Sequence, residues 1–144
     1  MKFFLLIITS YLVLFSFNQT LISAKNSHFD DGKRLFDNKN YKDSKFYFEK
    51  DITFNPKSEN SYLYLAKIFK EKENDSLEEN NLNTVLLLNP KNEEAIYLLT
   101  LLNIKISNFS KAKELIVSFN SVCKKMCSSK LELQSRLDNS LKSE

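Results

Sequence analysis

Two segments of this chain end in the same way. Residues 54–56 read Phe-Asn-Pro, and residues 88–90 read Leu-Asn-Pro. Proline lacks the backbone N–H that a helix interior needs, and it biases the residue before it away from the helical region. Each Asn-Pro is therefore expected to end a helix, and the chain is expected to repeat one unit at the spacing that separates Pro56 from Pro90.

The scarcity of turn-forming residues favours helices throughout. The chain of 144 residues has two prolines and one glycine, Gly32, whereas an all-β chain of this length needs many such residues. Hydrophobic residues make up 42% and charged residues 27%, which is enough apolar surface for a core and enough charge for solubility. We expect one compact all-α domain.

The spacing of the two prolines, about 34 residues, and the residues around them resemble the tetratricopeptide repeat family. With each proline at repeat position 32, three repeats span residues 25–58, 59–92 and 93–126. Small and large residues stand at the family's packing positions, although Glu78 replaces a small residue and the third repeat ends without proline. These residues are Gly32, Leu35, Tyr41, Ser44 and Phe48 in the first repeat, Tyr62, Leu65, Ala66 and Phe69 in the second, and Ile96, Leu99, Thr100, Phe109 and Ala112 in the third.

Residues 127–144 are expected to form a capping helix and tail. Leu131, Leu133 and Leu137 alternate with polar residues, and Ser129 followed by Glu132 is a capping-box pattern. A helix with one polar face would cover the last apolar surface of a repeat array. The resemblance thus implies a right-handed tetratricopeptide-like α-solenoid of helix-turn-helix repeats with a C-terminal capping helix.

The amino terminus has the pattern of a secretory signal peptide. Lys2 precedes an apolar run from Phe3 to Phe17, and Ala24 is a small residue suited to the position before a cleavage site. We expect residues 1–24 to be removed, leaving a periplasmic or secreted chain without a stable membrane anchor. Retention of the run as an anchor is the alternative, although about 20 apolar residues are usually needed to span a membrane.

The two cysteines are separated by three residues, as Cys123 and Cys127. An exported chain is expected to oxidise them, and a turn at a helix end would bring their Cα atoms into disulfide range. The favoured interpretation is a structural link between the third repeat and the capping helix. A redox pair is the alternative, and a metal site lacks a nearby third ligand.

The sequence offers no catalytic motif and no cofactor signature. His28 is the only histidine, and it is interpreted as a solvated surface residue. Lysines alternate with Glu and Asp along every segment, which argues against nucleic-acid binding because phosphates require a clustered basic face. We therefore expect no enzyme, no metal and no cofactor.

The family resemblance implies a groove along the first helix, helix A, of each repeat. Residues at repeat positions 5, 9, 12 and 13 would face a bound peptide there. They give an apolar ladder flanked by lysines, which would suit an extended segment carrying hydrophobic side chains and a carboxylate. The alternative is that the apolar residues pack between helices and the lysines only solvate the surface. The groove residues are Phe29, Lys33, Phe36, Leu63, Lys67, Lys70, Tyr97, Leu101, Ile104 and Lys105.

The sequence thus predicts an exported adaptor that binds a protein or peptide and catalyses no reaction. One alternative is a structural subunit of a larger envelope complex or of a homodimer, because three repeats are near the minimum for an independently stable array. A redox factor that uses the cysteine pair is the less favoured alternative.

Overall fold

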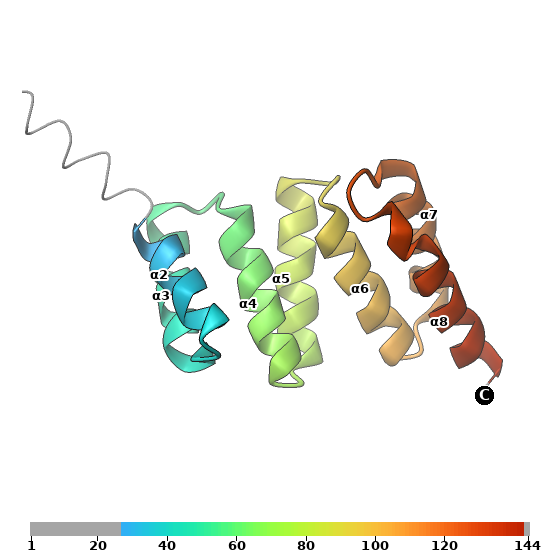
Figure 1. The fold of residues 1–144 in the computed structure, drawn as a ribbon, viewed down its shortest axis with the longest axis horizontal. Helices are drawn as coiled ribbons and strands as arrows, with labels where there is room; N and C mark the ends of the chain where they lie inside the picture. The colour runs from blue at the N-terminus through green and yellow to red at the C-terminus, as the bar shows by residue number, and fades with distance from the viewer. Residues whose placement is uncertain (1–26, 143–144) are drawn as a thin grey trace, which may run out of the picture. The chain divides into compact units, whose positions relative to one another are not determined.

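The computed structural model describes residues 27–142, so the signal-peptide prediction for residues 1–24 lies outside the described residues. The described part contains seven α-helices and one short 3₁₀ turn and no strand (Figure 1). No described helix is both long and apolar enough to cross a membrane. The elements are α2 (Ser27–Asp37), α3 (Tyr41–Phe54), α4 (Glu59–Glu71), α5 (Asp75–Leu88), α6 (Glu93–Lys105), α7 (Phe109–Val122), η1 (Cys127–Ser129) and α8 (Lys130–Lys142).

The contacts divide the chain into two compact units. The first unit ends at Tyr47 and the second begins at Phe48, so the boundary falls inside α3. In the first unit, the Ser44 hydroxyl donates a 2.8 Å hydrogen bond to the backbone oxygen of Gly32, and both residues are buried. This contact explains the small residues expected at these positions, since a larger side chain at either one would separate the two backbones.

The helix bounds follow the period set by the two prolines. The A helices α4 and α6 begin one period apart, at Glu59 and Glu93, and the second, or B, helices α3, α5 and α7 begin at residues 41, 75 and 109. Pro56 and Pro90 lie in the loops after α3 and α5, where they were expected to end helices. Within the second unit, helices α4 to α8 pack in chain order, each against the next.

Each A-to-B turn uses a left-handed residue that is not glycine. Lys39, Glu73 and Ser107 have φ of 59°, 53° and 58°, and they too recur once per repeat period. In the third turn, the Ser107 N–H donates to Ile104 O and the Asn108 N–H donates to Asn103 O, at 3.1 and 2.8 Å. The other two turns repeat both hydrogen bonds, which define a Schellman motif that ends each A helix.

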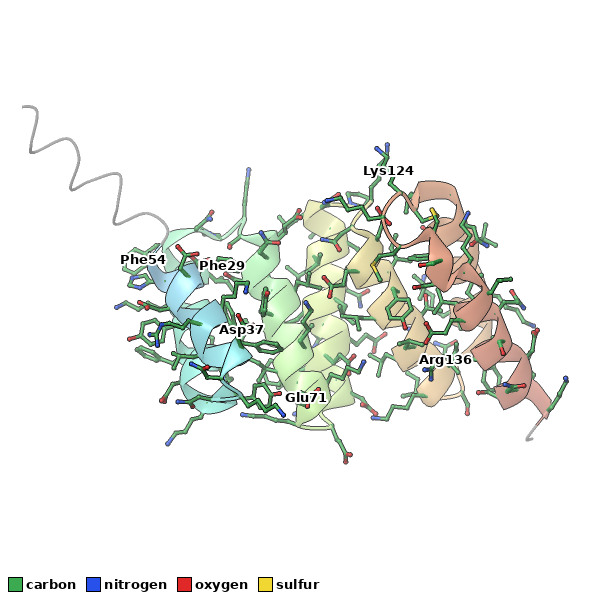
Figure 2. The ribbon with its side chains drawn as sticks, in the orientation of Figure 1. Phe29, Asp37, Phe54, Glu71, Lys124 and Arg136 are labelled. Atoms are coloured by element: carbon green, nitrogen blue, oxygen red, sulfur yellow. A yellow bond between two sulfur atoms is a disulfide. The ribbon has the colours of Figure 1, made fainter. Side chains whose placement is uncertain are left out.

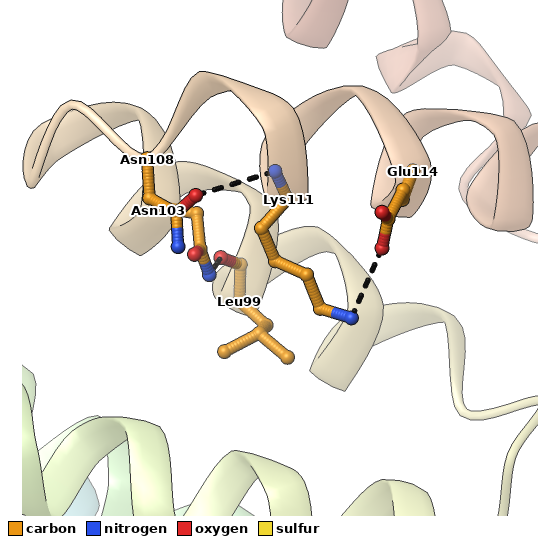
Figure 3. Close-up of polar contacts among 5 residues, drawn as sticks. All are labelled: Leu99, Asn103, Asn108, Lys111 and Glu114. Carbon is orange, nitrogen blue, oxygen red and sulfur yellow. Dashed lines mark hydrogen bonds and ion pairs between the residues drawn. The ribbon is translucent and has the colours of Figure 1, made fainter.

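An asparagine caps the start of each B helix. The side-chain oxygens of Asn40, Asn74 and Asn108 accept a hydrogen bond from the backbone N–H three residues later, at 3.3, 3.1 and 3.4 Å. Figure 3 shows this bond from Lys111 N–H to Asn108. Asparagine is among the preferred N-cap residues because its side chain satisfies a donor that the helix leaves unpaired. Part of the asparagine content of the chain therefore has a structural role.

The second unit is built around one apolar cluster supplied by α4 to α8. Most positions expected to pack in this unit are buried, among them Ala66, Leu99 and Ala112, whereas Tyr62 and Phe109 are half-buried. Two acidic side chains are also buried: Asp51 accepts a hydrogen bond from the Ser61 hydroxyl, and Glu78 is 3% exposed. Burial raises the pKa of Glu78, Asp75 adds to this effect, and Lys70 and Lys105 oppose it.

Helix α8 covers the end of the array in the register of an A helix. Leu133 and Leu137 are buried, and they follow Leu99 and Asn103 of α6 by one repeat period. The capping-box expectation was wrong, because the Ser129 N–H donates to Met126 O and the Glu132 side chain is engaged elsewhere. The 3₁₀ turn over residues 127–129 takes the place of a capped helix start.

Candidate functional site

The candidate site is the side of α4 and α6 that carries the predicted groove residues of the second unit; we call it the A-helix face. Leu63 is 5% exposed and Ile104 is 9% exposed, so both contribute to the core rather than to a binding surface. Leu101 is half-buried and packs against the same core, and Lys70 is exposed. The face therefore offers a partner the half-buried Leu101 of α6 and the cations Lys67 and Lys70 of α4.

Lys67 is already oriented by its neighbours. Its ammonium lies 2.7 Å from the Glu94 carboxylate of α6 and 4.6 Å from the ring centroid of Tyr64. The pair joins two successive A helices, and only 22% of the lysine side chain is exposed. An ammonium has three donors, so Lys67 retains capacity for a further acceptor beside Glu94.

Tyr97 is tied to the capping helix. Its hydroxyl donates a 3.0 Å hydrogen bond to Glu132, which also accepts from Arg136 at 2.9 Å. Hydrogen bonds from Arg136 and Tyr97 lower the pKa of Glu132, whereas burial and the bond to Glu132 raise the pKa of Tyr97. These contacts fix the orientation of the Tyr97 ring at the border between α6 and α8.

Lys105, at the end of α6, is directed toward the turn between α4 and α5. Its ammonium lies 2.6 Å from the Asp75 carboxylate at the start of α5, and this hydrogen bond raises the pKa of Lys105. The structure therefore places Lys67 and Lys105 in separate ion pairs and does not gather them around one point. Of the predicted lysines in the second unit, Lys70 alone forms none of the ion pairs described in residues 27–142.

The other three predicted groove residues belong to the first unit, which is described by itself. Lys33 forms an exposed ion pair with Asp37 at 2.8 Å. Phe36 is half-buried, and its ring centroid lies 5.4 Å from that of Tyr41. Phe29 is half-buried on α2. In this unit the two rings of Phe36 and Tyr41 pack at the turn between α2 and α3.

A disulfide closes the loop between α7 and α8. Cys123 and Cys127 are bonded, with their Cα atoms 5.2 Å apart, and this loop links the third repeat to the capping helix. Glu93 at the start of α6 accepts hydrogen bonds from the backbone N–H groups of Lys125 and Met126 at 2.9 and 2.8 Å. The backbone hydrogen bonds, that of Met126 first, lower the pKa of Glu93.

A shallow groove of about 300 Å³ runs between α7 and α8. Ile116 and Leu137 form its buried floor, and the exposed side chains of Val117 and Leu141 line its sides. The polar residues around it carry both signs of charge, as Lys113 and Asp138 show. No group of three or more metal-ligating side chains is found in the described part of the chain.

Several contacts of the site were not predicted from the sequence. Glu94, Glu132 and Arg136 form the polar contacts that orient Lys67 and Tyr97. Glu59 and Glu93 stand one repeat period apart, and this spacing could have indicated that they have the same role. Glu59 contacts the loop after α5, and Glu93 contacts the loop after α7. Glu59 accepts from the side-chain amides of Asn89 and Asn92 at 3.2 and 3.4 Å.

Comparison with solved structures identifies the fold. The Yersinia enterocolitica type III secretion chaperone SycD in complex with a peptide of the translocator YopD aligns with a TM-score of 0.72 and 11% identity, covering 83% of this chain and 94% of that chain. The TPR2B domain of yeast Sti1 aligns with a TM-score of 0.73 and 13% identity, covering 83% and 98%. The chain has the tetratricopeptide repeat fold.

A third similar structure is the first tetratricopeptide domain of Spaghetti (RPAP3) bound to the HSP90 peptide SRMEEVD. It has a TM-score of 0.72 and 14% identity, and it covers 81% of this chain and 92% of that chain. No protein-family model matches the sequence, and no curated protein does either. The likeness at these identities concerns the fold and the helix-pair packing of the tetratricopeptide repeat.

Proposed function

We propose that this chain is an exported, non-catalytic adaptor whose A-helix face binds an extended segment of a partner protein. The tetratricopeptide fold supports a protein-interaction module, since similar structures contain bound peptides of YopD and HSP90. The observation that carries the proposal is the position of half-buried Leu101 on the same face as the exposed Lys70 and the oriented Lys67.

The chemistry of the face suggests what the bound segment carries. An apolar side chain would cover Leu101, and a carboxylate would add to or replace Glu94 at the Lys67 ammonium. Because Glu94 already neutralises Lys67, the exchange of one carboxylate for another makes the electrostatic contribution of this pair small. We therefore expect affinity to come mainly from apolar contact and the carboxylate to set the register of the segment.

The test is cross-linking and pull-down from the exported fraction with a Leu101→Gln, Lys70→Glu variant. The matched control is Val117→Gln, Lys113→Glu on α7, which also changes one apolar residue and one lysine. Because Leu101 packs against the core and Val117 is exposed, helical circular dichroism and thermal unfolding must show that both variants fold as wild type does. The proposal expects the first variant to lose partners that the control retains. If the first variant and wild type capture the same partners, the A-helix face is not the binding surface.

The groove between α7 and α8 favours a second candidate, a structural subunit of a larger complex or of a homodimer. Val117 is 69% exposed and Leu141 is 40% exposed beside an apolar floor. Loss of partners by the α7 control alone, or a dimer of the purified chain that this control dissociates, would support this candidate. A monomeric chain whose partners depend on Leu101 and Lys70 would contradict it.

Export and the cysteine pair are tested separately. Mass spectrometry of the protein from the exported fraction should find Lys25 as the first residue, and an intact Met1 would contradict cleavage after Ala24. Replacement of Cys123 and Cys127 by serine should leave partner binding unchanged if the disulfide is structural. Loss of a thiol-dependent activity in that variant would favour a redox factor instead.

A further inference from the structure

We propose that one edge of the second unit binds an anionic membrane surface. This edge, the loop edge, consists of the three B-to-A connections at residues 55–58, 89–92 and 123–129, which lie along the upper side of Figure 1. The inference goes beyond the proposed adaptor function and uses none of the residues of the A-helix face. It rests on how charge and apolar side chains are distributed along the three loops.

Lysines that form no described ion pair gather on the loop edge, although the charge of Lys125 contributes, after backbone hydrogen bonds, to the lowered pKa of Glu93. Lys57, Lys91 and Lys125 recur once per repeat period, and Lys124 adds to the third loop. All four are exposed, and none forms an ion pair described within residues 27–142. Figure 2 shows Lys124 projecting outward from its loop. Because the period brings one lysine to each loop, their charges add along a single edge.

The acidic residues near this edge are occupied inside the fold. Glu59 accepts from the amides of Asn89 and Asn92, and Glu93 accepts from the backbone N–H groups that follow Cys123. Glu94 is paired with Lys67. Neutral donors leave the negative charges of Glu59 and Glu93 in place, but the four lysines outnumber these two carboxylates, so the loop edge keeps a net positive charge.

The opposite edge differs in charge. The turn between α4 and α5 carries Glu71, Glu73 and Asp75 next to Lys72, and Asp75 is paired with Lys105. Charges of both signs alternate there, as on an ordinary solvated surface. At this turn three acidic residues accompany one lysine, whereas the three loops of the loop edge carry lysines and no acidic residue.

Two apolar side chains accompany the lysines. Leu131 and Leu87 are 83% and 82% exposed, the highest values among the large hydrophobic residues of the described chain. Leu87 lies at the end of α5 and Leu131 at the start of α8, each within one turn of a loop. Single apolar side chains at a surface can insert into the boundary between headgroups and acyl chains of a bilayer. Lysines beside such side chains add attraction to anionic headgroups.

The test is sedimentation of the purified full chain with vesicles of phosphatidylcholine alone or with roughly one third phosphatidylglycerol. The N-terminus is verified by mass and kept identical in all variants. Wild type should bind the anionic vesicles and be released by salt. The Lys57→Gln, Lys91→Gln, Lys124→Gln, Lys125→Gln variant should bind up to about a thousandfold more weakly, at about 1 kcal/mol per lysine. A Leu87→Ser, Leu131→Ser variant should lose about tenfold.

The matched control replaces four other exposed lysines by glutamine, at Lys42, Lys72, Lys113 and Lys142, and so has the same net charge. It should bind as wild type does. The proposal is overturned if wild type does not bind anionic vesicles, if it binds both vesicle types equally, or if the two quadruple variants weaken equally. Binding to polyglutamate without binding to vesicles would overturn it in favour of an acidic protein partner.

Discussion

Asn103 is the residue at which the third repeat departs most clearly from its counterparts. It is fully buried in α6, at the repeat position held by Phe69 in α4 and Leu137 in α8. Its side-chain nitrogen donates a 2.8 Å bond to Leu99 O, as Figure 3 shows, but its side-chain oxygen has no hydrogen-bond partner. Leucine has nearly the same branched shape, so Asn103→Leu should fit the site without displacing the helix.

The expected gain follows from three contributions. Removing a buried oxygen without a partner gains about 1 to 3 kcal/mol, and losing the bond to Leu99 O costs about 1 kcal/mol. That carbonyl keeps its backbone hydrogen bond within the helix. The two methyl groups of leucine add about 1 kcal/mol of apolar burial. We expect a net gain of about 2 kcal/mol in the free energy of unfolding and a melting temperature about 8 °C higher.

Urea and thermal unfolding followed by circular dichroism measure the effect. Asn83→Leu is the matched control, because Asn83 is exposed on α5 and the same substitution there should change stability by less than about 0.5 kcal/mol. Asn103→Ala should be less stable than Asn103→Leu by about 2 kcal/mol, since it leaves a cavity. A leucine variant no more stable than wild type would refute the reasoning that Asn103 is a buried polar group at an apolar position.

Three further predictions concern single side chains. Ser107→Gly should raise the free energy of unfolding by about 1 kcal/mol in urea titration, because glycine adopts the positive φ of this turn without strain. Glu78→Ala should raise the melting temperature, and buried Ala112 already fills the same position one repeat later. The gain should grow from pH 4 to pH 7, because the raised pKa of Glu78 means that its ionised form is unfavourable in the fold. Glu93→Gln should lower the free energy of unfolding at neutral pH. The pKa of Glu93 is lowered in the fold, so its ionised form stabilises the fold above the unfolded pKa of about 4.3, and this stabilisation is lost as the pH decreases through the folded pKa. The variant lacks this contribution, so its stability should decrease less in acid. Unchanged unfolding curves across pH 3 to 7 for either Glu variant would contradict the corresponding prediction.

The repeat and its core could be predicted because the physics behind them is local. Pro56 and Pro90 disrupt helices wherever they occur, and the apolar spacing of Leu65, Ala66 and Phe69 marks one face of a helix without reference to any partner. The helix bounds and the burial of these three residues agree with that expectation. The prolines and the apolar face of a helix could be identified from the sequence because each has its own residue pattern.

The left-handed turn residues were not predicted, although their positions repeat. Lys39, Glu73 and Ser107 share no chemical property that signals a positive φ, and the single glycine of the chain is not at such a turn. The asparagine caps were not predicted either, although Asn40, Asn74 and Asn108 recur once per repeat period. Composition alone hid them, because asparagine is frequent throughout the chain.

The polar contacts of the A-helix face could not be predicted, because they depend on side chains from separate helices. The pairing of Lys67 with Glu94 joins two different repeats, and the bond from Tyr97 to Glu132 joins the third repeat to the capping helix. Many other lysine and glutamate combinations are equally compatible with the sequence. Packing selects among them, because the register of α4, α6 and α8 determines which side chains come within reach.

The loop after α7 is held in two chemically unrelated ways. The bond between Cys123 and Cys127 depends on redox conditions, whereas the clamp of Glu93 on the N–H groups of Lys125 and Met126 depends on pH. A reducing environment removes the first and leaves the second, and acid does the reverse. The conformation of the loop that connects α8 to the third repeat is thus held by two independent contacts, and a single change of surroundings leaves one of them intact.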